Sequence, residues 1–233
     1  MKNLVIDSGW KGPPQCSHCD IRKVGIFSAL SDEASALIHE PIDEMRVRKG
    51  RILYQAGTPA NHVFTIREGM VKVVRASSSG EEKIVRLIKR GDVVGIEALL
   101  EQNYKATAIV LDDVLTCRIP VSVADRLTNE LPQFQHHLLV RWQRCIDQAD
   151  RWLIELRTGS IKKRAALFLF RLAEAEPSHI IFIPPIPDIS NILAVNTSTI
   201  SRVMAEYKRA GLLKKVEPMR FKVAMDEFQS YLQ

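Results

Sequence analysis

The chain has 233 residues, of which 46% are hydrophobic and 26% are charged, and its net charge is +6. This length and composition suit two modest globular domains and exclude collagen-like and disordered chains. The longest apolar run, 180–187, is too short to span a bilayer and contains three prolines, so we expect no membrane partner. The small excess of basic residues is compatible with nucleic-acid binding but does not require it.

Two cysteines, Cys16 and Cys19, form a Cys-x-x-Cys pair near the N-terminus. The apolar start of the chain breaks at Asp7, before it reaches the length of a signal-peptide core, so we expect a cytoplasmic protein. Four cysteines are too few for a disulfide scaffold at this length. In a reducing compartment the pair indicates metal binding or redox chemistry, and a functionless pair in a loose arm stays open as the alternative.

Between residues 43 and 120 the sequence consists of short apolar or alternating runs separated by glycines. The runs lie at 63–66, 70–74, 84–88 and 114–119. Such spacing is typical of an antiparallel β-roll, with glycine at the tight corners. Before it, Ser31, Asp32 and Glu33 indicate the start of a short helix that packs on the roll.

A single long helix is predicted from about Pro132 to Arg157. Its apolar positions recur every three or four residues, which is a near-heptad seam and favours self-association over packing on the chain's own roll. This candidate dimer interface comprises Phe134, Leu138, Trp142, Cys145, Ala149, Trp152 and Leu156. Thr158, Gly159 and Ser160 are expected to end the helix and to form a hinge to a second domain.

Residues 188–204 have the spacing of a helix-turn-helix. The apolar positions expected to join the two helices are Ile189, Leu193, Val195, Ile200 and Val203. Ser190 and Ala194 are small where the helices approach or turn, Asp188 can cap the first helix, and Asn196 or Thr197 can cap the second. The alternative is an ordinary helical hairpin with solvated serines.

The second of these helices presents short hydroxyls and one guanidinium at its N-terminal end, the end that enters a DNA major groove. The candidate DNA-binding residues are Thr197, Ser198, Thr199, Ser201 and Arg202, followed after the helix by basic residues that include Lys208 and Lys214. Strand-like residues 212–223 predict a β-wing beside the helix. From Ser160 onward there are 11 Lys and Arg against 7 Asp and Glu, so this third carries +4 of the net charge. The alternative for these basic residues is a solvated charged face.

Over roughly residues 16–230 the layout resembles the CRP/FNR family of bacterial transcription regulators. The matching stretches are Lys49-Gly50 with Gln55-Ala56-Gly57, Ile66-Arg67-Glu68-Gly69 with Val71-Lys72, Gly91-Asp92-Val93-Val94-Gly95, and Thr199-Ile200-Ser201-Arg202. The resemblance implies a cyclic-nucleotide-binding-type β-roll, a dimerisation helix and a winged helix-turn-helix that reads a palindromic site in double-stranded DNA and recruits or blocks RNA polymerase.

The chain departs from the family members that bind cyclic AMP. Those members resemble one another in a Gly-Glu pair and in an Arg-Ser or Arg-Thr pair, whereas this chain has Ile96 after Gly95 and Ala106 before Thr107. No acid therefore meets the ribose and no guanidinium meets the cyclic phosphate. Glu97 and Lys105 lie one position away and could compensate only through a register shift, so we do not expect cyclic AMP as the ligand.

The oxygen-sensing branch of the family holds an iron-sulfur cluster on four cysteines, and Cys16, Cys19 and Cys117 match three of those positions. The remaining position, near Gly25, has no cysteine, although Asp20, His18 or an exogenous ligand could complete the set. By itself Cys117 is typical of a buried apolar residue. Ser198 stands where the commonest recognition helix of the family has a glutamate, so the half-site is expected to differ.

We therefore predict an α+β protein with an arm at 1–25, a β-roll sensor at 26–131, a dimerisation helix at 132–158 and a winged helix-turn-helix at 159–233. The expected function is that of a homodimeric, DNA-binding transcription regulator responding to redox state, oxygen or another small signal. No catalytic motif is present, so we expect no enzymatic activity. The alternatives are a redox or metal-binding protein with a scaffold-like C-terminal domain, and a cyclic-nucleotide-type module acting on a protein partner.

Overall fold

The structure is a computed structural model that describes residues 26, 42–174 and 176–232. The chain divides into two compact units, and the division falls between Cys145 and Ile146, inside the longest helix. The expected helix at 31–38 and the Cys16–Cys19 pair lie outside the described residues. Within the described ranges, none of the helices combines the length and the apolar character that a bilayer span requires.

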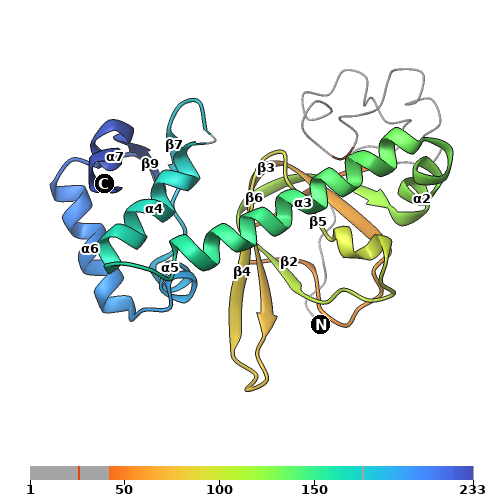
Figure 1. Cartoon of the computed structure of the whole chain (residues 1–233), viewed down its shortest axis with the longest axis horizontal. Coiled ribbons are helices and arrows are strands. Elements are labelled where there is room, and N and C mark those ends of the chain that lie inside the picture. The colour runs from red at the N-terminus through yellow and green to blue at the C-terminus, as the bar shows by residue number, and fades with distance from the viewer. Residues whose placement is uncertain (1–25, 27–41, 175, 233) are drawn as a thin grey trace. The chain divides into compact units, whose positions relative to one another are not determined.

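The first unit contains an antiparallel β-roll (Figure 1). Its strands are β1 (Asp43–Val47), β2 (Ile52–Tyr54), β3 (His62–Ala76), β4 (Glu82–Ile88), β5 (Val93–Val94) and β6 (Thr107–Pro120). The order in the sheet is β1-β6-β3-β4, while β2 pairs with β6 and β5 pairs with β3. The long strands β3 and β6 pair along most of their length, so they form the framework of the roll.

Two of the expected short strands are parts of one strand, β3, which contains Gly69 in its middle. Gly69 has φ +83°, and a Cβ at this position would overlap the backbone carbonyl of Asp113. The pairing of β3 with β6 shifts register on both sides of this residue, as at a β-bulge. The glycine that indicated a turn thus bends one continuous strand.

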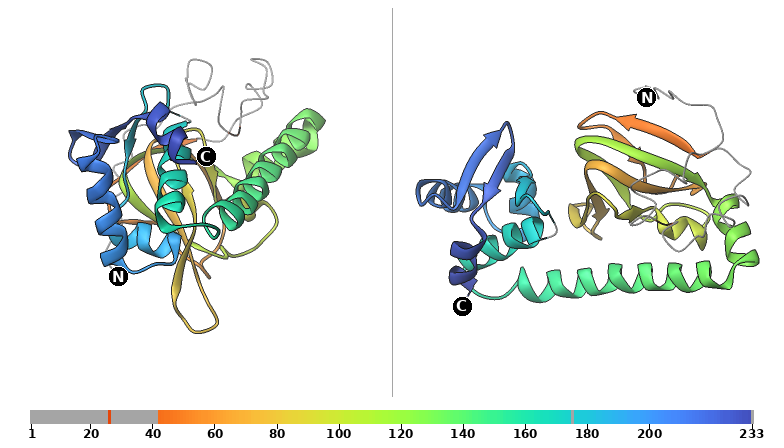
Figure 2. Two further views of the ribbon diagram at one scale, coloured as in Figure 1. Left: turned by 60° about the vertical axis from the view of Figure 1, so that its left-hand side comes forward. Right: turned by 90° about the horizontal axis from the view of Figure 1, so that it is seen from above.

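Helices close the roll and continue from it. The 3-10 helix η3 (Ile96–Leu99), α2 (Val121–Glu130) and the first turns of α3 (Pro132–Glu155) bury apolar residues against the strands. Figure 2 shows α3 as one long helix, in agreement with the predicted span. Phe134 is fully buried in the core of the first unit, together with Leu127 of α2.

The second unit follows the end of α3 with α4 (Ile161–Glu174), β7 (Ile180–Phe182), α5 (Ile186–Leu193), α6 (Thr197–Arg209), β8 (Leu213–Glu217), β9 (Arg220–Val223) and α7 (Met225–Leu232). The three strands form a small antiparallel sheet in the order β7-β9-β8. The sequence reading did not include α7, although the acids in its first turn, Asp226 and Glu227, favour a helix start. Phe228 anchors α7 with an edge-on contact to Tyr207 of α6, at 5.3 Å between ring centroids.

Candidate nucleic-acid interface

The first helix of the motif, α5, begins at Ile186, three residues earlier than a cap at Asp188 would place its start. Its N-cap is Pro185, and Pro187 lies in the first turn, where a missing amide costs nothing. The prediction that Asp188 caps this helix is wrong because Asp188 already lies inside the first turn, where its charge favours the helix N-terminus. The helix is held by its apolar face, on which Ile189, Ile192 and Leu193 are buried.

The turn between α5 and α6 is closed by Ser190 and Val195. The amide of Val195 donates to the carbonyl of Ser190 at 3.1 Å, and the Ser190 hydroxyl donates back to the carbonyl of Val195. Between them Ala194 has φ +50°, a left-handed conformation that costs a non-glycine residue about 1 to 2 kcal/mol. The reciprocal bonds offset this cost, so Ser190 does more than provide the small volume expected from the sequence.

The second helix, α6, has one buried and one exposed face. Ile200, Val203, Met204 and Tyr207 are buried. On the opposite face, Thr197, Ser198, Ser201 and Arg202 are exposed, whereas Thr199 is half-buried. The helix thus presents three hydroxyls and one guanidinium from its first two turns.

At the N-terminal end of α6 the amide of Thr199 donates to the carbonyl of Asn196 at 3.0 Å, but the end has no side-chain cap. Asn196 occupies the N-cap position, as expected, but its side chain makes no capping hydrogen bond. The first amides of a helix need acceptors from outside the helix and carry partial positive charge. An anion such as a DNA phosphate suits this end.

The strands β8 and β9 form a basic two-stranded ribbon that follows α6 (Figure 2). Lys214 and Lys222 are paired directly across the two strands, and Lys215 is exposed next to Lys214. Lys208, at the end of α6, places its ammonium 4.8 Å from the centre of the Phe221 ring on β9. This cation–π contact joins the helix to the ribbon while leaving Lys208 exposed.

In the roll, residues 96 and 106 stand where family members that bind cyclic AMP have a glutamate and an arginine, and both are apolar in this chain. Ile96 and Ala106 are both buried. The Thr107 hydroxyl accepts the amide of Ala56 at 3.1 Å, so it already has a partner inside the roll. The side chains of Ile96 and Ala106 therefore supply neither an acid for a ribose nor a guanidinium for a cyclic phosphate.

Two stacked tyrosines lie beside this loop. The rings of Tyr54 and Tyr104 are 4.0 Å apart, and both lie against Gly95. The Tyr104 hydroxyl donates to the carbonyl of His62 at 2.6 Å. Burial raises the pKa of Tyr54, and it raises the pKa of Tyr104 to about 12, so both phenols stay protonated at neutral pH.

Comparison with known proteins agrees with both units. The cyclic nucleotide-binding domain family matches residues 44–130. The chain is similar to the regulatory protein HlyX of Actinobacillus pleuropneumoniae, at 26% identity over 205 residues covering 85% of each chain. It is also similar to the anaerobic regulatory protein of Pasteurella multocida, at 24% identity over 85% of this chain and 75% of the relative.

Solved structures show the same fold. FixK2 from Bradyrhizobium japonicum matches with a TM-score of 0.73 at 19% identity, covering 82% of this chain and 98% of that one. A CRP-family transcriptional regulator from Thermus thermophilus matches with a TM-score of 0.65 at 21% identity, covering 80% of this chain and 95% of that one.

The chain belongs to the CRP/FNR family of transcription regulators. This confirms the resemblance read from the sequence, and the expectation that the chain is not an enzyme agrees with its relatives, which are regulators. In this CRP/FNR regulator, α5 and α6 form the helix-turn-helix and the β8–β9 ribbon forms the wing. Val195 is the one member of the expected apolar set that is only half-buried.

The two cysteines that the structure describes, Cys117 and Cys145, lie on different elements. Cys117 is partly buried on β6, where it pairs with Glu44 of β1 on one side and Thr65 of β3 on the other. Cys145 is partly buried on α3, and burial raises the pKa of its thiol. Within the part of the chain that the structure describes, no three His, Cys, Asp or Glu side chains are grouped to hold a metal ion.

The expected dimer seam on α3 is largely occupied within the chain. Phe134, Leu138 and Leu156 are buried, and Trp142 packs against the core of the roll. Trp152 makes an edge-on contact with Phe168 of α4 at 6.5 Å. Cys145 is partly buried, and Ala149 alone of the seven is exposed.

A second apolar stripe on α3, one residue further along, is exposed. Leu139, Ile146 and Leu153 are spaced by seven residues, and their exposed fractions are 60%, 52% and 62%. Ile154 extends the stripe at its end. Both stripes on α3 have regular spacing in the sequence. The spacing alone therefore does not show which stripe packs on the chain's own core and which is exposed.

Proposed function

We propose that this CRP/FNR-type regulator acts as a homodimer that reads a palindromic DNA site with α6 of each copy. The observation that carries the proposal is the exposed hydroxyl and guanidinium face on the first two turns of α6, next to a ribbon rich in lysine. Recognition helices of this motif contact base edges with their N-terminal residues. A two-fold dimer places two such helices about one helical turn of DNA apart.

Each candidate DNA-binding residue in the first two turns of α6 has a role in this proposal. Arg202 reads a guanine edge by donating two hydrogen bonds, and Thr197, Ser198 and Ser201 bond base edges or phosphates. Thr199 is half-buried, so its contact is restricted to a phosphate close to the helix. Because Ser198 lacks the carboxylate that selects a cytosine amino group, the half-site differs from one read by a glutamate.

The basic residues at the end of α6 and on the ribbon supply affinity without sequence preference. Lys208 and Lys214 are exposed and lie on adjoining elements, the end of α6 and the ribbon. Neutralising phosphates in this way gives binding that weakens as salt rises. The proposal therefore separates base reading by α6 from phosphate binding by the ribbon.

For the dimer, we assign the contact to the exposed stripe Leu139, Ile146 and Leu153. Burying a Leu or Ile side chain stabilises an interface by about 1.5 to 3 kcal/mol. Three such residues at heptad spacing, with Ala149 beside them, suit a parallel helix pair. Of the seam read from the sequence, Cys145 and Trp142 can contribute only at its margin because they already pack on the roll.

For the signal, we propose oxygen or redox state, read through Cys16, Cys19 and Cys117, and not cyclic AMP. The support comes from the relatives named anaerobic regulatory protein and, in Vibrio cholerae, fumarate and nitrate reduction regulatory protein, and from the apolar contacts of Ile96 and Ala106. Thiolates at these cysteines would supply three ligands for an iron-sulfur cluster. Anaerobic purification followed by absorption near 400 nm and iron and sulfide analysis tests for the cluster, and a colourless, iron-free protein would contradict it.

The DNA-reading function is tested by selection from a pool of random duplexes with the full-length protein. We expect a two-fold symmetric sequence to be enriched and to compete effectively against bulk DNA. Enrichment of no sequence would favour the scaffold or cyclic-nucleotide alternatives. On a promoter that contains the selected site, transcription by RNA polymerase should change on addition of the protein, in a direction that the experiment determines.

A further inference from the structure

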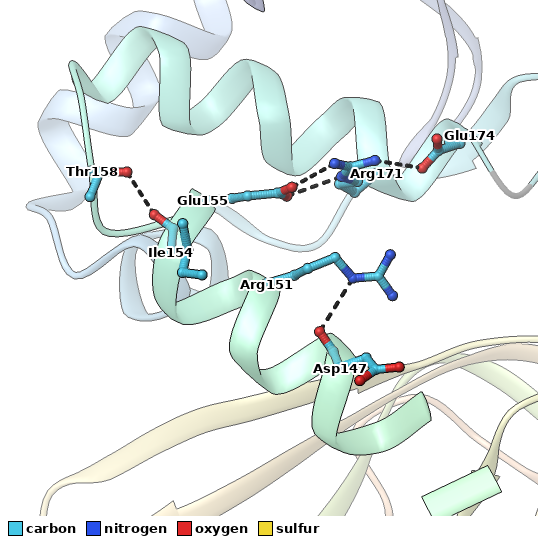
Figure 3. Close-up of polar contacts among 7 residues, drawn as sticks. All are labelled: Asp147, Arg151, Ile154, Glu155, Thr158, Arg171 and Glu174. Carbon is cyan, nitrogen blue, oxygen red and sulfur yellow. Dashed lines mark hydrogen bonds and ion pairs between the residues drawn. The ribbon is translucent and has the colours of Figure 1, made fainter. Parts of the chain in front are cut away.

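The end of α3 is joined to α4 by a bidentate ion pair between Glu155 and Arg171 (Figure 3). Arg171 donates from Nη2 to Oε1 of Glu155 at 2.5 Å and from Nε to Oε2 at 3.0 Å. Its third nitrogen, Nη1, donates to Glu174 of the same helix at 3.0 Å. The Glu155 side chain is 20% exposed, so this pair is better shielded from solvent than a surface pair.

A second arginine of α4, Arg164, joins the ends of two helices. Its Nε donates to the carbonyl of Leu156, directly after α3, at 2.7 Å. Its Nη2 donates to the carbonyl of Leu193, the last residue of α5. The carbonyls at a helix C-terminus have no partner within the helix, and the Arg164 guanidinium donates to one such carbonyl from each of two helices. It thereby connects the end of α3 to the helix-turn-helix.

The same α4 is fixed to the reading helix. Lys162 pairs with Glu206 of α6 at 2.6 Å, and the hydroxyl of Tyr207 donates to the carbonyl of Lys162 at 2.5 Å. Contacts therefore run without a break from Glu155 and Leu156 through α4 to α6. The segment 157–160, which includes the hinge expected at Thr158, Gly159 and Ser160, is bridged on both sides by these bonds.

We propose that Glu155, Arg171 and Arg164 are positioning residues for DNA reading, which lock the last turns of α3 and the helix-turn-helix into one body. The proposal rests on the homodimeric function proposed above, because the dimer then holds each α6 at a fixed place through α3. The separation of the two reading helices is set by the dimer helices and not by a flexible loop. The lock makes the protein discriminate between sites by the spacing of their half-sites.

The first test measures binding to the selected palindrome and to duplexes with the half-sites moved apart by one, two or three base pairs. Glu155→Gln removes the charge that bridges the helices, whereas the matched control Glu174→Gln removes a carboxylate from the same arginine without breaking the bridge. We expect Glu155→Gln to reduce the preference for the original spacing by about 3- to 10-fold, and Glu174→Gln to leave it unchanged. Equal preference in wild type and Glu155→Gln would overturn the proposal, as would an equal loss in both variants.

The second test does not involve DNA, so it separates failure of the lock from failure of the proposed function. Arg157 is exposed in the bridged loop, and trypsin cleaves after it only when the loop opens. We expect Glu155→Gln to speed cleavage after Arg157 about 3- to 10-fold relative to Glu174→Gln. Equal cleavage rates in the two single variants would overturn the lock, whether or not the wild type selects a palindrome.

Discussion

Lys214 of β8 and Lys222 of β9 lie directly opposite each other across the ribbon that follows α6, and both are exposed. Paired residues of antiparallel strands point to the same face, and like charges there are destabilising. The ribbon therefore carries a repulsion that a bound anion would relieve. A DNA phosphate is the anion that the neighbouring helix-turn-helix brings within reach.

Lys214→Gln should weaken DNA binding equally on the selected site and on a scrambled duplex. Because one phosphate contact is lost, the slope of log affinity against log salt concentration should become shallower by about 1. Fluorescence anisotropy across a salt series measures this slope. Lys105→Gln, a change to an exposed lysine of the roll, should leave the slope as in wild type. A loss restricted to the selected site would show that Lys214 reads bases and would contradict its assignment to phosphate.

Ile146→Asp should convert the dimer to a monomer. The substitution places a charge in the middle of the exposed stripe formed with Leu139 and Leu153, and burying an unpaired charge costs several kcal/mol. Sedimentation or light scattering gives the mass directly. Leu100→Asp changes a residue of the roll that is 73% exposed, and it should leave the mass unchanged. If Ile146→Asp remained a dimer, the dimer contact would lie on a surface other than this stripe.

Ser190→Ala should destabilise the second unit without creating a clash. The variant loses the hydroxyl that donates to Val195, which corresponds to about 0.5 to 1.5 kcal/mol of unfolding free energy. Thermal or urea unfolding followed by circular dichroism measures the change. Ser201→Ala, on the exposed face of α6, should unfold like the wild type. If both variants unfold alike, the Ser190 hydroxyl does not stabilise the turn.

The first unit should lose stability as the pH falls below the usual histidine pKa of 6.5, in part because of His62. Burial and the nearby Arg118 hold the pKa of His62 below that value in the folded chain. The unfolded state therefore binds the proton more readily, so His62 contributes stability above pH 6.5 that is lost as the pH falls through its folded pKa. Burial shifts Asp92 in the opposite sense by raising its pKa.

Urea unfolding between pH 8 and pH 5 measures this effect, with the pH range chosen around the usual histidine pKa of about 6.5. His62→Gln should have a flatter dependence of unfolding free energy on pH than the wild type. An unchanged slope in His62→Gln would mean that His62 does not contribute to the pH dependence.

The helix-turn-helix could be predicted closely from the sequence because its spacing is local. Ile189, Leu193, Ile200 and Val203 are all buried where two crossing helices need apolar contacts. The start of α5 was misplaced because Asp188 is a good capping residue, while the preceding prolines already favour a first turn. Boundaries depend on such competing local preferences.

The face of α3 that is free for the proposed dimer contact could not be predicted in the same way. Leu138 and Leu139 belong to neighbouring stripes with equally regular spacing, and only the fold shows that Leu138 is buried in the roll. Similarly, Gly69 indicated a corner, but it lies at a bulge within β3. Glycine is needed there because the backbone of Asp113, far away in the sequence, leaves no room for a Cβ. Contacts between residues far apart in sequence decide both cases.

Base reading by α6 is tested most directly with Arg202→Ala on the selected duplex and on duplexes that each carry one changed base pair. Arg209→Ala, at the far end of the same helix, is the matched control. We expect Arg202→Ala to lose about 1 to 3 kcal/mol of binding free energy on the selected site and to become indifferent to one base pair in each half-site. An equal loss on every duplex, including a scrambled one, would contradict base reading and reduce α6 to a phosphate contact.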